Sequence, residues 1–189
     1  KPFANGIVSH PIQQAVIELR NEFSLKAEQI DSIEAKVHPL VLELMNRANP
    51  RVGLEGKFSF QHCAAAALID GAGHDAQFSD EKVNDPKIVM IRSKVSATVD
   101  KAVAEDEVYL SINLLDGRKL EKHIEHATGS PTNPMTDEAL NEKYQTLASE
   151  VLPQTQVEEL AAAVWELDHA SDVADISRLM QITPKSSNT

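Results

Sequence analysis

The chain has 189 residues, of which 42% are hydrophobic and 25% charged, and this balance excludes fibrous, low-complexity and disordered classes. The 29 acidic and 18 basic residues give a formal net charge of −11, which disfavours nucleic acid and anionic lipid as partners. The single cysteine, Cys63, excludes an internal disulfide and a cysteine-rich zinc site. No apolar run approaches the length of a membrane span. We therefore expect a cytoplasmic protein with no membrane or nucleic-acid partner.

The first third of the chain predicts a helix followed by a strand. Apolar residues recur at helical spacing over residues 9–23, with Ser9 or His10 as the cap and Pro11 in the first turn. Residues 32–38 alternate between polar and apolar side chains, which is typical of a half-buried strand.

A second helical region follows a predicted loop over residues 46–56. An alanine-rich helix begins at Ser59, runs to about residue 70 and ends at Gly71. Its small side chains allow a neighbouring element to pack closely against it. A short helix is predicted over residues 85–92, because an aspartate followed by proline suits a helix start.

The middle of the chain carries the clearest strand signals. Alternating apolar residues predict strands over residues 95–99 and 108–114. Asp116-Gly117 is a strong signal for a two-residue hairpin turn, so the second of these strands should pair with residues 119–125.

The last third returns to helical periodicity. One helix starts at Thr136, a capping box over residues 155–158 opens a second, and Ser171 caps a third. Residues 183–189 have the composition of a flexible tail. We predict an α+β fold over residues 1–182: a small mixed or antiparallel sheet with a central hairpin, covered by helices, with a helical C-terminal part.

Motifs that would carry known chemistry are scarce. The sequence has no nucleophile elbow, no phosphate-binding glycine loop and no dinucleotide fingerprint. His123 and His126 lie close together, but on a strand they point to opposite faces and cannot by themselves close a metal site. We expect them to be solvated.

The start of the alanine-rich helix is the first candidate site. With Ser59 as the cap, Lys57, Gln61 and His62 lie beside exposed backbone N–H groups at the positive end of the helix dipole, a setting that favours carboxylates. The alternative is that Lys57 is a solvated cation and His62 a surface residue, while the phenylalanines beside Ser59 anchor the core.

The beginning of the chain is the second candidate site. Lys1 and His10 flank a short loop that leads into the first helix, so both side chains can face the same anion. The alternative is that His10 only caps the helix and Lys1 is exposed.

Five motifs in order resemble the MmgE/PrpD family over roughly Lys1 to Met180. They are Lys1-Pro-Phe, Ser9-His10, the segment from Lys57 through the alanine run to Gly71, Asp116-Gly117, and the segment from Gly129 to Thr136.

The resemblance implies the second, smaller lid domain of that family, with the larger helical N-terminal domain absent from this chain. Members act on small polycarboxylates without a metal or organic cofactor; they include 2-methylcitrate dehydratase, cis-aconitate decarboxylase and iminodisuccinate epimerase. Their active site lies between the two domains, so the isolated lid should be inactive. The resemblance also implies a homodimer for the full-length protein.

The family motifs place candidate site residues at Lys1, His10, Lys57, Ser59 and position 62. Dehydratase and decarboxylase members often carry tyrosine at position 62, where this chain has His62.

A second departure lies in the loop after the first lysine. Decarboxylase-like members tend to place a histidine there, where this chain has Asn5 and Gly6. The two departures weaken an exact assignment to the dehydratase or the decarboxylase activity and leave the general chemistry intact.

The expected chemistry moves a proton on carbon next to a carboxylate, so cations stabilise the negative charge that develops. The predicted catalytic residues are His62, Lys57, Lys1 and His10, and the predicted substrate-binding residues are Ser59, Lys57 and Gln61. The leading hypothesis is a 2-methylcitrate dehydratase-like hydro-lyase. Its alternatives are an epimerase or decarboxylase of the same family, or a noncatalytic binding or dimerisation module.

Overall fold

The computed structural model describes residues 1–182 and divides the chain into two compact units, Lys1–Pro134 (unit 1) and Met135–Thr189 (unit 2). The sequence predicts a single domain over residues 1–182, and this range includes unit 1 and the described part of unit 2. Each unit is described by itself. The predicted tail over residues 183–189 lies outside the described residues. Among residues 1–182, no helix is both long and apolar enough to cross a membrane.

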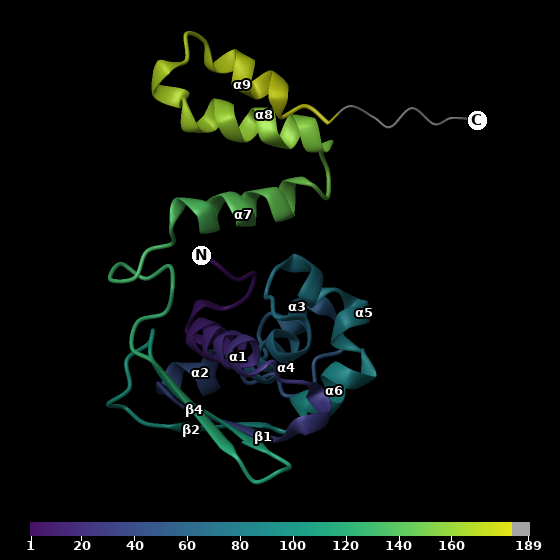
Figure 1. Ribbon diagram of the computed structural model, residues 1–189, viewed down its shortest axis with the longest axis vertical. Coiled ribbons are helices and arrows are strands. Elements are labelled where there is room, and N and C mark those ends of the chain that lie inside the picture. The colour runs from purple at the N-terminus through teal and green to yellow at the C-terminus, as the bar shows by residue number, and fades with distance from the viewer. Residues whose placement is uncertain (183–189) are drawn as a thin grey trace, which may run out of the picture. The chain divides into compact units, whose positions relative to one another are not determined.

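Unit 1 is built on a four-stranded mixed sheet with the strand order β2-β1-β3-β4 (Figure 1). Strand β1 (Ile30–Val37) pairs in parallel with β2 (Val95–Val99) and antiparallel with β3 (Val108–Leu114). Strand β4 (Lys119–Ile124) pairs antiparallel with β3. The predicted hairpin is confirmed, and Gly117 in its turn has a φ of 87°, a conformation that glycine adopts without strain.

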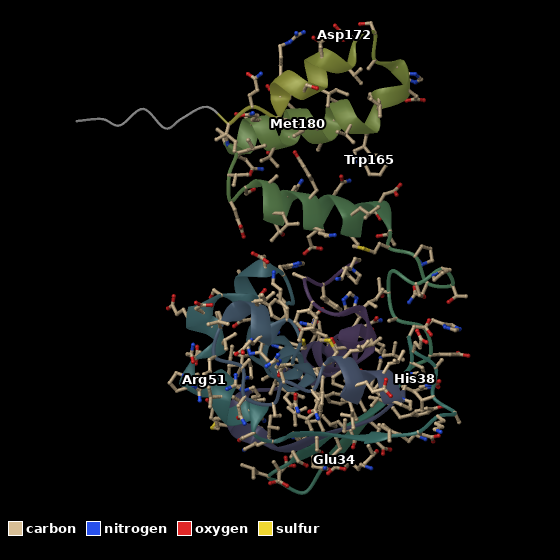
Figure 2. The ribbon with its side chains drawn as sticks, turned by 180° about the vertical axis from the view of Figure 1, so that it is seen from behind. Glu34, His38, Arg51, Trp165, Asp172 and Met180 are labelled. Atoms are coloured by element: carbon tan, nitrogen blue, oxygen red, sulfur yellow. The ribbon has the colours of Figure 1, made fainter. Side chains whose placement is uncertain are left out.

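The helices of unit 1 cover one face of the sheet (Figure 1). The two longest are α1 (His10–Phe23) and α4 (Phe60–Asp70), which pack against each other. On the opposite face, Glu34 points away from the helices (Figure 2). The shorter elements are η1 (Ile7–Ser9), η2 (Ala27–Gln29), α2 (Pro39–Leu44), α3 (Gly53–Gly56), η3 (Asp75–Phe78), α5 (Asp80–Val83) and α6 (Pro86–Arg92).

The alanine-rich helix α4 lies at the centre of the core. Residues 63–67 have no exposed surface, because their small side chains let α1 and α6 pack closely on either side. Ser59 is the N-cap and Gly71, with a φ of 70°, is the C-cap, as predicted. The predicted inward face of β1 is also confirmed, since Ile33, Ala35 and Val37 are all buried. The α+β prediction therefore describes unit 1 well.

In its described part, unit 2 consists of α7 (Asp137–Ala148), α8 (Gln154–Trp165), a short turn η4 (Leu167–His169) and α9 (Val173–Leu179). Trp165 reaches from α8 to α7, where its indole N–H donates a hydrogen bond of 2.7 Å to the side chain of Asn141 (Figure 2).

Two predicted helix starts in unit 2 are wrong. The N-cap of α8 is Pro153, not Thr155, so the predicted capping box does not form; instead Gln154 Nε2 donates to Glu158 Oε1 at 2.8 Å. The N-cap of α9 is Asp172, one residue after the predicted Ser171, and its carboxylate accepts a hydrogen bond from the Ala174 N–H. Aspartate and serine cap helices equally well, so adjacent candidates are not separated by propensity alone.

Candidate functional site

A pocket of about 410 Å³ in unit 1 brings Lys1 and His10 together. Lys1 comes from the start of the chain and His10 from the first turn of α1. Two loops complete the pocket: the loop between β2 and β3, and the loop that follows β4. The remaining lining residues are Pro2, Ile7, Val8, Glu105, Asp106, Ala127, Thr128, Gly129, Ser130 and Pro131.

The Lys1-Pro2 segment packs closely against the loop after β4. Gly129 has a φ of 88°, and a Cβ atom added there would lie 2.9 Å from Pro2 Cδ. Glycine is therefore needed both for the backbone conformation and for the close approach of the Lys1-Pro2 segment. Lys1, Pro2 and Gly129 all line the pocket.

His10 lines the pocket from a buried position, with only 1% of its surface exposed. The ring of Phe3 contacts it edge-to-face, with 5.2 Å between the ring centroids. Ser9, rather than His10, is the N-cap residue of α1, although the Ser9 hydroxyl donates to the Gly6 carbonyl at 2.8 Å instead of capping the helix. The fold therefore aims His10 at the pocket independently of any capping role.

The charge in the pocket is mixed. Lys1 supplies positive charge, while Glu105 and Asp106 bring carboxylates on the loop between β2 and β3. The Asp106 carboxylate lies 2.9 Å from Nδ1 of His126. Lys1 and His10 are the groups of the pocket that suit an anionic ligand.

The start of α4 does not line this pocket. The Lys57 ammonium lies 2.5 Å from the carboxylate of Asp75, and the fully buried Ser59 hydroxyl accepts a hydrogen bond from the His62 N–H at 3.1 Å. Gln61 is also buried and donates to the side chain of Asn46 at 3.0 Å. The fold itself thus occupies the polar groups that the sequence predicted for a substrate.

His62 is completely buried rather than exposed at the surface. Its Nε2 lies 2.8 Å from the backbone carbonyl of Gln77, which requires the hydrogen to be on Nε2. Burial lowers the pKa of His62, and the Gln77 carbonyl opposes that shift. A catalytic role for His62 stays a prediction, and it requires the turn η3 to move away from the ring.

The structure gives His123 and His126 carboxylate partners. His123 Nε2 lies 2.8 Å from Glu107 Oε1, and the imidazole stacks on Tyr109 with 4.0 Å between ring centroids. The Ala104 N–H lowers the pKa of Glu107. Both histidines therefore fasten the end of β4 to the loop that lines the pocket. Within residues 1–182, no group of three His, Cys, Asp or Glu side chains is placed to hold a metal ion.

A larger hollow of about 790 Å³ lies on the open face of the sheet. It contains neither Lys1 nor His10, the two predicted site residues that the smaller pocket brings together. We therefore take the smaller pocket as the candidate site.

Sequence reasoning did not identify the loop after β4 as a wall of the site. The sequence pointed to this loop only through the segment from Gly129 to Thr136, which resembles a family motif. No residue of that segment was predicted to be catalytic. Glu105 and Asp106 gave no signal, because acidic residues are frequent in this chain.

Comparisons with known proteins identify the family of the chain. Cis-aconitate decarboxylase of Mus musculus is 26% identical over 191 residues, covering 96% of this chain and 39% of the relative. The Homo sapiens enzyme of that name is 28% identical over 144 residues (74% of this chain, 30% of the relative), and one from Aspergillus terreus is 27% identical (72% and 29%). The chain thus spans between 29% and 39% of the length of these relatives. Residues 3–168 match the MmgE/PrpD C-terminal domain, and the chain belongs to this family.

Proposed function

We propose that this chain is the lid part of a lyase that acts on a small polycarboxylate and that its substrate contacts the pocket of Lys1 and His10. The observation that carries the proposal is that Lys1 and His10, on either side of a short loop, line one pocket of about 410 Å³. A cavity of this size suits a small organic acid. The ammonium of Lys1 suits a carboxylate, and the imidazole of His10 suits proton transfer.

Decarboxylation of cis-aconitate is the reaction to test first. Four curated relatives carry that name, which favours it over the dehydration of 2-methylcitrate expected from the sequence. In a decarboxylation of this kind, the bond to one carboxyl carbon breaks and carbon dioxide leaves. The electron pair moves through the double bond onto the carboxylate that is conjugated with it, and a proton is added to carbon.

The same pocket also fits the chemistry of a dehydration. A base removes a proton from the carbon next to a carboxylate, and the hydroxyl group leaves as water after it is protonated. Both reactions build negative charge on carboxylate oxygens in the transition state, so a cation at Lys1 lowers either barrier. Epimerisation shares the proton-removal step. Carbon dioxide leaves in the decarboxylation and water in the dehydration, whereas epimerisation returns a proton to the other face of the carbon. The proposed role of Lys1 is the same in all three.

We propose that the rest of the full-length protein supplies the other wall of the site. The supporting fact is length, since the relatives are more than twice as long as the part that this chain matches. Residues of that missing wall can include the primary base. Closure of the two walls would exclude water and strengthen the attraction between Lys1 and a carboxylate.

The test is a panel assay of the full-length protein with cis-aconitate, 2-methylcitrate and iminodisuccinate. We expect turnover of one acid, and a fall in kcat/KM of at least about tenfold in Lys1→Ala and His10→Gln. Lys87→Ala removes an exposed lysine from the start of α6 and serves as the control that keeps wild-type rates. Turnover of none of the three acids, or wild-type rates in both site variants, would contradict the proposal.

A second candidate function is assembly, as a noncatalytic dimerisation module. It is favoured by the large apolar side chains that α7 to α9 leave exposed, among them Trp165 at 50%. Self-association measured by sedimentation, with no effect of added polycarboxylate on mass or melting temperature, would support assembly alone.

A further inference from the structure

Asn5 is a buried polar residue in the segment between Lys1 and α1. Only 3% of its surface is exposed. Its amide Nδ2 donates to Gln13 Oε1 at 2.9 Å and to Ser9 Oγ at 3.3 Å, both on or next to α1. The same group contacts Cys63 Sγ, on α4, at 2.7 Å. The Asn5 side chain therefore connects the segment between Lys1 and α1 to both α1 and α4.

The backbone on either side of Asn5 is fastened as well. The Ala4 N–H donates to the Gly73 carbonyl at 2.9 Å, and the Gly6 N–H donates to the Lys57 carbonyl at 3.1 Å. The segment thus runs from the pocket that holds Lys1 to Lys57, two residues before the N-cap of α4. It is the direct physical link between the two candidate sites of the sequence.

The surroundings of Asn5 are uncharged. Burial raises the pKa of Cys63 to about 11, so this side chain remains a thiol at neutral pH. Gln13 is fully buried, and neither its Nε2 nor Asn5 Oδ1 has a hydrogen-bond partner within the described residues. The hydrogen bonds of the Asn5 amide therefore all pass through Nδ2. A buried polar group with unmet capacity destabilises a fold, which makes a role in fixing one conformation the natural explanation for its presence.

We propose that Asn5 is a positioning residue that acts through Lys1. Its amide holds the Phe3–Gly6 segment in one register against α1 and α4, and that register places Lys1 at the pocket. The Asn5 side chain is buried against α1 and α4 and does not line the pocket. The inference rests on the proposed function, because it assigns Asn5 a part in the same site.

The test compares Asn5→Ala with Gln13→Ala in the full-length protein. Both variants remove the same 2.9 Å hydrogen bond from the same buried cluster, but only Asn5 lies on the segment that carries Lys1. We expect similar losses in melting temperature for the two variants. In Asn5→Ala, kcat/KM for the substrate falls on the order of 10- to 100-fold, because small displacements of a positioned group are costly, whereas Gln13→Ala stays within about threefold of the wild type.

Hydrogen–deuterium exchange provides a readout that does not need turnover. The peptide covering residues 2–7 contains the Ala4 and Gly6 N–H groups, and its exchange should become faster in Asn5→Ala and stay slow in Gln13→Ala. If Asn5→Ala does not fold, Asn5→Ser keeps a donor at this position and replaces it in the same comparison.

Equal rate losses in the two variants, or unchanged exchange of this peptide in Asn5→Ala, would overturn the inference. If the wild-type protein turns over none of the acids, the proposed function fails, and the exchange experiment alone decides whether Asn5 fixes the segment. The two failures are therefore distinguishable.

Discussion

The two units differ in how much apolar surface they bury. Unit 1 has a contiguous core in which the inward residues of β1, β3, α1 and α4 are almost all inaccessible. The described part of unit 2 buries three hydrophobic residues, Val157, Leu160 and Ile176. Nine large ones are exposed: Leu140, Leu147, Val151, Val164, Trp165, Leu167, Val173, Met180 and Ile182. Helical periodicity therefore predicts that a helix forms. It does not predict whether other residues of the same unit bury the apolar face of that helix.

Truncating a core side chain should have the largest effect on the free energy of unfolding. Ile112 on β3 has no exposed surface, so Ile112→Ala should lower the free energy of unfolding by about 2–5 kcal/mol. Leu147 on α7 is 39% exposed, and Leu147→Ala should cost less than about 1 kcal/mol. Chemical denaturation of the chain measures both. Equal costs would show that α7 is packed as tightly as the sheet and would break the comparison.

A pH dependence should arise from the buried histidine of unit 1. Burial lowers the pKa of His62 from 6.5, so below about pH 6.5 the unfolded chain binds a proton that the folded chain does not. The stabilisation is complete above pH 6.5 and is lost as the pH falls, by at most about 1.4 kcal/mol per pH unit. Denaturation at pH 7.5 and 5.5 should show a smaller pH effect in His62→Gln than in the wild type. The side chain of His169 in unit 2 is 73% exposed, so His169→Gln should show the same pH effect as the wild type. A reduced pH effect in His169→Gln and a wild-type effect in His62→Gln would contradict the assignment of the pH dependence to His62.

Two glycines of unit 1 have almost the same φ but different surroundings. Substituting each by alanine therefore distinguishes the cost of backbone strain from the cost of a steric clash. Gly129 and Gly117 have φ values of 88° and 87°, but a Cβ at Gly129 would lie 2.9 Å from Pro2 Cδ, whereas nothing lies within 4 Å of a Cβ at Gly117. Gly117→Ala should cost about 1 kcal/mol from strain alone. Gly129→Ala should cost about 1 kcal/mol more and also reduce kcat/KM of the full-length protein, because Pro2 must shift. Equal stabilities and equal rates would mean that the Pro2 contact does not position Lys1.

Removing a surface ion pair should have the smallest effect on the free energy of unfolding. Such pairs occur in both units. Lys57 pairs with Asp75 in unit 1, and Arg178 pairs with Asp175 in unit 2. Because these pairs are partly or largely solvated, Lys57→Ala and Arg178→Ala should each change the free energy of unfolding by less than about 1 kcal/mol. A loss above 2 kcal/mol in either variant would show that ion pairing, rather than apolar burial, separates the units.

Local signals predicted most of unit 1 correctly. The Asp116-Gly117 turn and the caps of α4 are encoded by a few adjacent residues, so sequence identifies them directly. The parallel pairing of β1 with β2 was not predicted, because the two strands are joined through α2 to α6 and no local pattern fixes which strands become neighbours.

The candidate site was predicted in part. Lys1 and His10 share a pocket as the sequence suggested, because only a short loop separates them. Lys57 and His62 do not line that pocket, since the turn η3 covers them: Asp75 meets Lys57 and the Gln77 carbonyl meets His62. Three-residue and four-residue turns leave little trace in hydrophobic periodicity, so their contacts become visible only in the structure.

The most direct test of the central claim is the rate of carbon dioxide release from cis-aconitate by the full-length protein and by its Lys1→Ala variant. We predict measurable turnover by the wild type and at least about a tenfold lower kcat/KM in Lys1→Ala, with no change in melting temperature. Equal rates in the two proteins would contradict the account, because the pocket of Lys1 and His10 would then not hold the reacting acid.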